Sequence, residues 1–334
     1  MPPSSQPRII RMAHPLAFAA YLRHHGERAD GLLENESLPV AGESDDAFVP
    51  LLRAWGFFDS TAQKLDQNIA WRVGLFTGEQ KLQQGLLNRL SSAPTLLSAL
   101  QTLMRLISAE ASRLQLGLQE RRDDVLFYTH YPDMKNFRGY HCSQAYQLGV
   151  YVTIVRHYAG MDWSPTEIGI EYPVVPSVTK ELFPGTRVRP RRLFGYVAIP
   201  RTLLHLAPPA PAQGDTADGE FLLLTDQLDY PDTLRALLVP HLPDGYPDAS
   251  LAAALMDTSV RTLARRLAES GLTYRKVVDE LRFTEARKLL TNSRHSIIDV
   301  AAAVGFDDPS HFSRMFRRIG GISPREFRRH ELEG

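Results

Sequence analysis

Apolar residues in the last quarter of the chain recur at the spacing of an α-helix. In the stretch SVRTLARRLAES, residues 259–270, the apolar positions are Val260, Leu263 and Leu267. In PSHFSRMFRRI, residues 309–319, they are Phe312, Met315, Phe316 and Ile319. Spacings of three and four residues predict one buried stripe on each helix. No alternating strand pattern interrupts this region, so we predict that it is all-helical.

Each of these helices follows a short apolar helix and a tight turn. The first is preceded by ASLAAALMD with a connection at residues 257–259, and the second by SIIDVAAAV with a turn at residues 305–308. Ser259 is a good N-cap, and Pro309 lies near the first helical position, where a missing N–H costs nothing. Between them, TYRKVVDELRFTEARKLLTNS has no internal glycine or proline and predicts one connecting helix. The pattern therefore predicts helix-turn-helix units at about 248–270 and 296–319, joined by a linker helix at about 273–292.

The N-terminal region mixes both periodicities and is predicted to be α+β, with helices covering a small sheet. Helical spacing occurs in AHPLAFAAYL, DAFVPLLRAWGFF, TAQKLDQNIAWRVGLF, SAPTLLSALQTLMRLISAEAS and SQAYQLGVYVTIVRHYAG. RLQLGLQERRDDVLFYTHY alternates on both sides of residues 121–124, which predicts a β-hairpin. PTEIGIEYP and RVRPRRLFGYVAIPR are short strand candidates on either side of a helical SVTKELF. We interpret the first of these helices as an amphipathic helix and not as a signal peptide.

Proline and small residues mark the clearest boundary, LAPPAPAQGDTADGE at residues 206–220, which predicts an extended linker. We place an effector-sensing and dimerisation domain at 1–205, a linker at 206–227 and a DNA-binding domain at 228–334. No apolar run approaches the length of a membrane span, and a single cysteine fits a reducing, cytoplasmic location.

Charge changes the picture only when it is counted by region. The chain carries 38 Lys+Arg and 38 Asp+Glu, but residues 250–334 carry 15 and 11, a difference of four positive charges. Arg261 and Arg265 are four residues apart and project side by side, as do Arg314 and Arg318. Arginine matches the O6 and N7 acceptors of guanine in the major groove. In paired helix-turn-helix units, these faces favour DNA contact over an ordinary solvated surface.

These residues carry a resemblance to a known family. SIIDVAAAVGFDDPSHFSRMFRRIGGISPREFRR resembles the C-terminal signature of AraC/XylS transcription regulators, and SVRTLARRLAESGLTYRKVVDELRFTEARKLL resembles their first unit and linker helix. The resemblance implies these base-facing positions: Val260, Arg261, Ala264 and Arg265, then Ser310, His311, Ser313 and Arg314. We add Thr262, Arg317 and Arg318 to the DNA-contacting candidates. Two departures are Asp257, where the family's first turn usually has glycine, and Gly320, where a larger residue is common; we expect both to be tolerated.

The N-terminal region is similar to the arabinose-binding-type sensor domain of one branch of that family, over about residues 47–204. The similar stretches are SSAPTLLSALQTLMRLI, DWSPTEIGIEYP and LFGYVAIPRTLL. This resemblance does not imply arabinose, and the helix content argues against the jelly-roll barrel of the founding member. Candidate effector-binding residues, chosen as aromatic side chains that could line a pocket, are Trp71, Phe76, Tyr140, Tyr146, Tyr151 and Trp163.

The resulting hypothesis is a DNA-binding transcription regulator, an activator controlled by a small effector of unknown identity. Its expected partners are double-stranded promoter DNA, RNA polymerase, the effector and a second copy of the chain, with no membrane and no cofactor. Two alternatives stay open: a ligand-independent regulator whose N-terminal domain only dimerises, and a small-molecule-binding or catalytic domain with a secondary DNA-binding tail. We expect no enzyme, because nucleophile-elbow, HExxH and Walker motifs are absent. The YHCS stretch at residues 140–143, with His130, matches no zinc-ligand spacing, so we expect no metal site.

Overall fold

A computed structural model describes residues 8–40, 47–79, 90, 93–107, 110–208, 228–292 and 295–333. The chain divides into two compact units: residues 10–227, and residues 228–334 together with residues 1–9. Most of the predicted linker, residues 209–227, lies outside the described residues. None of the helices in the described ranges is long and apolar enough to cross a bilayer.

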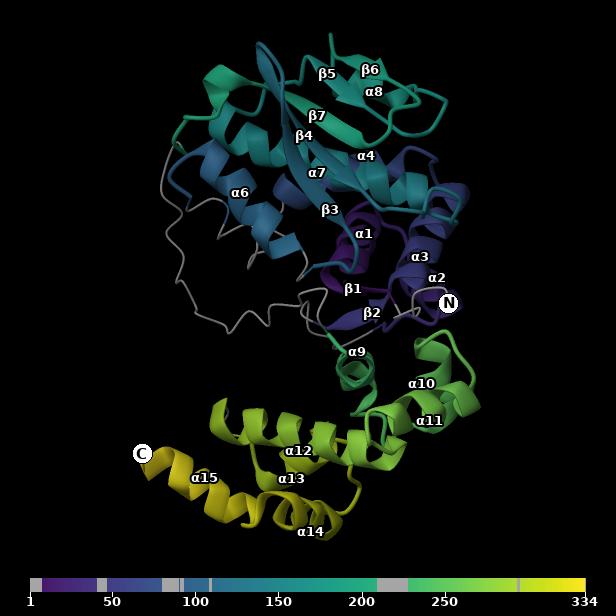
Figure 1. The fold of residues 1–334 in the computed structure, drawn as a ribbon, viewed down its shortest axis with the longest axis vertical. Helices are drawn as coiled ribbons and strands as arrows, with labels where there is room; N and C mark the ends of the chain where they lie inside the picture. The colour runs from purple at the N-terminus through teal and green to yellow at the C-terminus, as the bar shows by residue number, and fades with distance from the viewer. Residues whose placement is uncertain are drawn as a thin grey trace. The chain divides into compact units, whose positions relative to one another are not determined.

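A five-stranded sheet, ordered β3-β4-β7-β5-β6, forms one layer of the N-terminal unit (Figure 1). The predicted hairpin is present: β3 (Gln115–Glu120) pairs antiparallel with β4 (Asp124–His130). The last predicted strand segment divides into β6 (Arg187–Arg189) and β7 (Gly195–Pro200), because Arg191 turns the chain with a φ of 56°. β7 pairs with β4 and with β5 (Glu167–Gly169), and β5 runs parallel to β6. A separate pair joins β1 (Ile9–Arg11) and β2 (Phe48–Pro50).

Helix α7 (Tyr140–Ala159) is the centre of this unit and is buried on nearly all sides, as a helix enclosed by other elements must be. It packs against β7 and β4, and α4 (Ile69–Glu79) runs along it. The two helices touch through glycines: a Cβ added to Gly74 would lie 2.3 Å from the carbonyl oxygen of Tyr146 and 2.9 Å from the Cα of Gly149. This close approach requires glycine at residue 74.

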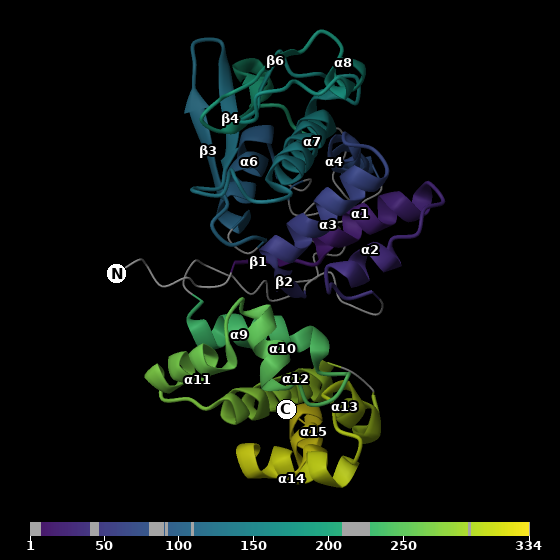
Figure 2. The same cartoon turned by 90° about the vertical axis from the view of Figure 1, so that its right-hand side faces the viewer.

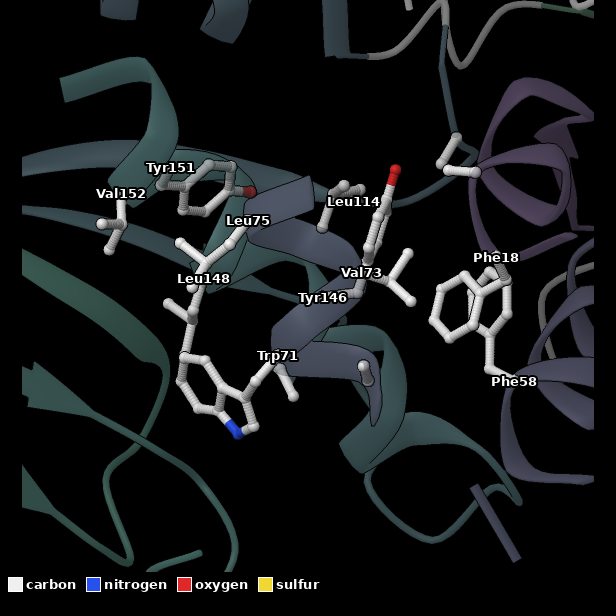
Figure 3. Close-up of a cluster of buried hydrophobic side chains, with 14 of the residues drawn as sticks. Phe18, Phe58, Trp71, Val73, Leu75, Leu114, Tyr146, Leu148, Tyr151 and Val152 are labelled. Carbon is white, nitrogen blue, oxygen red and sulfur yellow. The ribbon is translucent and has the colours of Figure 1, made fainter. Parts of the chain in front are cut away.

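Further helices complete the N-terminal unit: α1 (Ala13–His24), α2 (Asp30–Asn35), α3 (Leu51–Lys64), α6 (Leu96–Leu106), α8 (Val178–Leu182) and the 3-10 turn η2 (Arg201–Leu203). Large apolar side chains from these helices, α4 and α7 fill its core, including Phe18, Phe58 and Trp71 (Figure 3). The helix predicted within residues 92–112 begins at Leu96, where Thr95 and Ser98 form a capping box, but it ends at Leu106 and Ala111 pairs with Ile10 in a β-bridge.

Two further predicted boundaries in this unit were wrong. The helix predicted in DAFVPLLRAWGFF begins only at Leu51, because residues 48–50 pair as strand β2. The next predicted helix is interrupted, since α3 ends at Lys64 and α4 begins at Ile69. In the gap, the carboxylate of Asp66 accepts the backbone N–H of Asn68 at 2.9 Å, a local bond that competes with helix formation.

The C-terminal unit consists of helices over its described residues: α9 (Tyr230–Leu238), η3 (Val239–His241), α10 (Ala249–Leu255), α11 (Val260–Glu269), α12 (Tyr274–Asn292), α13 (Ile297–Ala303), α14 (Pro309–Gly320) and α15 (Pro324–Glu333) (Figure 2). Helix α12 is the predicted linker helix, and it packs against α9, α13, α14 and α15. The prediction was an α+β unit followed by an all-helical unit. The structure has this arrangement, with a sheet and helices in the first unit and helices in the second.

Buried Arg282 ties α12 to the turn that precedes α14. Its guanidinium donates to the carbonyl of Gly305 at 2.6 Å and lies over the ring of Phe306, 4.3 Å from its centroid. Desolvation lowers the pKa of Arg282, yet the aromatic faces of Phe306 and Tyr246 partly replace its lost hydration. Gly305 has a φ of 79°, and a Cβ there would lie 2.3 Å from the carbonyl oxygen of Leu242. Only glycine fits this turn.

Candidate DNA interface

Helices α10 and α11 form the first predicted unit. The hydroxyl of Ser259 caps α11 by accepting the backbone N–H of Thr262 at 3.2 Å. Leu263 and Leu267 are buried, as the apolar spacing predicts. Val260 is 44% exposed, so its placement in the buried stripe was wrong. Val260 is the first residue of α11, and the buried stripe begins one turn further along the helix, at Leu263.

The turn before α11 has the backbone conformation that usually selects glycine. Asp257 adopts a φ of 47°, in the left-handed region, where an L-residue with a Cβ is strained. The family resemblance placed glycine at this position, and the structure confirms that the turn needs a left-handed residue. Gly305 supplies the same conformation in the second unit.

Asp257→Gly should therefore stabilise the protein by about 0.5 kcal/mol, because relief of left-handed strain exceeds the extra chain entropy of glycine. Asp257→Val is the matched control and should destabilise it by more than about 1 kcal/mol, since a β-branched residue fits this region worst. Hydrogen exchange of the α10 and α11 amides in the full chain measures both changes. Equal protection in the three proteins would show that Asp257 carries no strain.

Helices α13 and α14 form the second unit. Ser296 and Asp299 make a capping box at the start of α13, and the carboxylate of Asp308 caps α14 by accepting the N–H of Ser310 at 2.7 Å. That backbone hydrogen bond lowers the pKa of Asp308, so the cap stays ionised. The predicted stripe is buried at Phe312, Met315 and Phe316 and partly buried at Ile319.

Most candidate DNA-contacting side chains lie on the open faces of α11 and α14. The exposed ones are Val260, Arg261, Ala264, Arg265, Ser310, His311, Arg314, Arg317 and Arg318, whereas Thr262 and Ser313 are half-buried. Arg261, Arg314 and Arg317 form no ion pair with any residue in the described ranges. Arg314 and Arg317 only help to lower the pKa of Asp308 and Glu326 from a distance, so among the described residues no carboxylate holds these three guanidinium groups and they can bind phosphate or base edges.

Several other candidates already have partners inside the protein. The Arg318 guanidinium binds Asp279 of α12 at 2.6 Å, which holds α14 against the linker helix. The hydroxyl of Ser313 donates to the carbonyl of Pro309 at 2.8 Å, and the hydroxyl of Thr262 lies 3.0 Å from that of Ser259. Arg265 has only a long contact, 4.0 Å, with Glu269. Arg318, Ser313 and Thr262 thus stabilise the fold of the free protein. The Arg265 side chain is held only weakly and can change conformation to bind DNA.

Gly320, the second departure from the family pattern, faces the linker helix. A Cβ there would lie 2.7 Å from two ring carbons of Phe283. The Phe283 ring packs on Phe316 with centroids 4.7 Å apart. The aromatic side chain thus occupies the space that a larger residue at 320 would take.

The six effector candidates do not lie together. Tyr146 and Tyr151 line one cavity in the N-terminal unit. Trp71 stacks edge-on against Phe183, and Phe76 lies against Tyr21 at the end of α1. The remaining pair, Tyr140 and Trp163, lie elsewhere: the Tyr140 hydroxyl donates to Glu171 at 2.6 Å, and the Trp163 carbonyl accepts from Arg156 at 2.9 Å.

The YHCS stretch forms the first turn of α7. Burial raises the pKa of the Cys142 thiol to about 12, so a reactive thiolate is disfavoured there. His130 lies 3.3 Å from the buried carboxylate of Glu171, which also accepts from Tyr140 and Gln144 and pairs with Lys135. Within the described ranges there is no group of three or more side chains arranged to hold a metal ion.

Comparison with known proteins agrees with this geometry. A family model described as a helix-turn-helix domain matches residues 252–330. The ornithine utilization regulator of Pseudomonas aeruginosa is 37% identical over 127 residues, 37% of each chain. The transcriptional activator RhaS of Escherichia fergusonii is 41% identical over 95 residues, 27% of this chain and 34% of RhaS. The chain thus matches about a third of the length of these curated relatives.

A solved structure is also similar to this chain. The transcriptional regulator CdpR from Pseudomonas aeruginosa is 22% identical, with 90% of this chain and 96% of that chain covered and a TM-score of 0.35. The two relatives above are named as transcription regulators, not as enzymes. Residues 252–330 form a helix-turn-helix domain that is similar to those of transcription regulators.

Proposed function

We propose that the protein is a sequence-specific transcription regulator, an activator, whose C-terminal unit binds promoter DNA and whose N-terminal unit binds a small effector. The observation that carries this proposal is the pair of helices α11 and α14. Each has a buried apolar stripe on one side and exposed arginines on another. Two such helices held on one linker helix suit neighbouring major-groove segments about one helical turn apart.

The contacts within the protein support different roles for the arginines. Arg261, Arg265, Arg314 and Arg317 are exposed and weakly held or unpaired among the described residues, so they are the candidates for guanine and phosphate contact. Arg318 positions α14 through Asp279. Among the arginines flanking this helix, Arg325 and Arg329 are exposed and suit phosphate.

Control by the effector follows from a shift between two populations of the protein. An effector that binds one arrangement of sensor and DNA-binding unit more tightly than another raises the share of that arrangement. Its effect is limited by the difference between the two affinities. A homodimer would place two DNA-binding units on repeated half-sites, where the bound activator would contact RNA polymerase in the cytoplasm.

Selection of genomic DNA fragments by the purified full-length protein tests this function. The proposal predicts recovery of a few discrete fragments bound at least about a thousandfold more tightly than random DNA. Binding to all fragments should weaken as salt rises, because arginines displace counterions from phosphates. Recovery of an unenriched pool both with and without a metabolite mixture would contradict sequence-specific binding.

A further inference from the structure

A mostly apolar cavity lies inside the N-terminal unit, beside α7. Its walls come from α1, α3, α6, α7 and the segments that follow α6 and β4. Figure 3 labels Phe58, Leu114, Tyr146 and Tyr151, which line it. The space between these walls, open solvent included, amounts to about 570 Å³.

Two buried phenols contribute to this cavity and have no hydrogen-bond partner among the described residues. Tyr131 is 2% exposed and Tyr151 is 3% exposed, and neither hydroxyl makes a hydrogen bond of good geometry, although Gln147 and Ser143 lie close to the first and Thr129 close to the second. The polar side chains near them already bond one another: Thr129 donates to Gln147 at 2.7 Å, and Gln147 donates to Ser143 at 3.3 Å. Buried hydroxyls normally donate a hydrogen bond. Two phenols without one on the same cavity therefore favour a ligand that supplies an acceptor.

Both phenols are donors at any physiological pH. Burial raises the pKa of Tyr131 and of Tyr151, because the apolar surroundings disfavour the phenolate. A neutral phenol offers one O–H to a ligand and holds its apolar ring against the ligand's hydrocarbon part. The cavity thus combines a mostly apolar wall with two phenol donors, beside the polar side chains of His14, Ser143, Tyr146 and Gln147.

The carboxylate that lines the cavity, Glu110, is already paired with a buried guanidinium. Glu110 lies 3.5 Å from the Arg11 guanidinium and 3.3 Å from the imidazole of His14, and the side chains of Glu110 and Arg11 are about 5–6% exposed. A cationic ligand would compete with Arg11 for this carboxylate, and an anionic ligand would meet its charge directly. A cationic ligand would also lose its hydration without a new acceptor, and the two phenol donors would replace only part of the hydration of an anion. The wall therefore favours an uncharged ligand.

We propose that this cavity is the effector site and that it binds an uncharged, largely apolar small molecule through a carbonyl or ether oxygen that accepts from Tyr131 or Tyr151. The inference rests on the proposed function for its regulatory meaning, but the binding claim stands on the cavity alone. The proposal requires that the ligand accept a hydrogen bond and that it carry no charge. Both requirements can be tested by measuring the affinity of chosen probes.

Four probes of nearly equal shape separate these features: acetophenone, α-methylstyrene, benzoate and protonated 1-phenylethylamine. Titration of the full-length protein with each, followed by calorimetry or ligand-observed NMR, gives the dissociation constants. Acetophenone should bind about three- to tenfold more tightly than α-methylstyrene, which lacks the carbonyl oxygen. Both charged probes should bind at least about tenfold more weakly than acetophenone.

Substitutions place the binding in this cavity. Tyr131→Phe and Tyr151→Phe together should remove the advantage of acetophenone over α-methylstyrene and leave α-methylstyrene binding in place. Tyr140→Phe is the matched control, because Tyr140 is a buried tyrosine of the same helix whose hydroxyl binds Glu171 outside the cavity. That variant should bind both probes as the unsubstituted protein does.

Three results would overturn the proposal: a charged probe that binds as tightly as acetophenone, an acetophenone advantage that survives the double Tyr→Phe substitution, or no binding of any probe at millimolar concentration. DNA selection uses no probe and tests the regulator function separately. A chain that binds DNA but no probe would contradict the cavity proposal alone, and a chain that binds acetophenone but no DNA would contradict the regulator function alone.

Discussion

Phe316→Ala is expected to destabilise the C-terminal unit by about 3–5 kcal/mol, the usual result of truncating a fully buried aromatic side chain. Phe316 is 0% exposed and contacts the rings of Phe283, Phe312 and Phe327, with centroids 4.7, 5.8 and 5.6 Å from its own. These rings belong to α12, α14 and α15, so the cavity left by alanine would loosen three helices together.

Hydrogen exchange of the α12, α14 and α15 amides in the full-length protein measures this loss without separating the units. Protection of all three helices should fall together, and the protein should lose specific DNA binding at temperatures where the unit unfolds. Arg317→Ala is the control, because this exposed neighbour on the same helix should change stability by less than about 0.5 kcal/mol. Unchanged protection after Phe316→Ala would mean that α14 is not held by this aromatic cluster.

The double substitution Arg261→Ala with Arg314→Ala is expected to weaken binding to a selected DNA site by about 2–6 kcal/mol, because each lost bidentate base contact removes about 1–3 kcal/mol. The two side chains lie on different recognition helices, α11 and α14, so their effects should add. Even the lower value is about a 30-fold loss of affinity. Neither side chain has an ion pair among the described residues, so their removal should leave the fold intact.

Charge-retaining and distant variants separate base reading from general attraction. Arg314→Lys should relax base preference and keep most of the salt dependence, since lysine retains the charge but not the planar fork of donors. Lys288→Ala, on the exposed face of α12, should change affinity little. If the double variant retained full specificity, α11 and α14 would not be the helices that read the bases.

The parts of the fold that the sequence predicted are those with strong local signals. The two short helix pairs and the linker helix follow from apolar spacing, N-caps and the absence of glycine or proline in α12. The left-handed conformation of Asp257 was expected from the family resemblance. The prediction went wrong at Val260, where a helix end has no core beneath it, and at residues 48–50, where the β1–β2 pairing overrode helical spacing.

The parts that could not be predicted depend on residues far apart in the chain. No local pattern shows that Asp279 holds Arg318, since 39 residues separate them, or that Arg282 reaches the carbonyl of Gly305. The cavity is a similar case: Glu110 and Tyr131 come from segments with no unusual spacing and meet α7 only in the folded unit. An aromatic residue chosen for its type alone, such as Trp71, is more often core than pocket, and here it packs on Phe183.

Hydroxyl-radical footprinting on a selected genomic fragment tests the central claim most directly. The account predicts that each bound copy protects two backbone segments about one helical turn, or 10–10.5 base pairs, apart. It also predicts that the Arg261→Ala, Arg314→Ala variant loses both at the same protein concentration. A single protected segment, or protection that is uniform along the fragment and identical for the variant, would contradict DNA reading by α11 and α14.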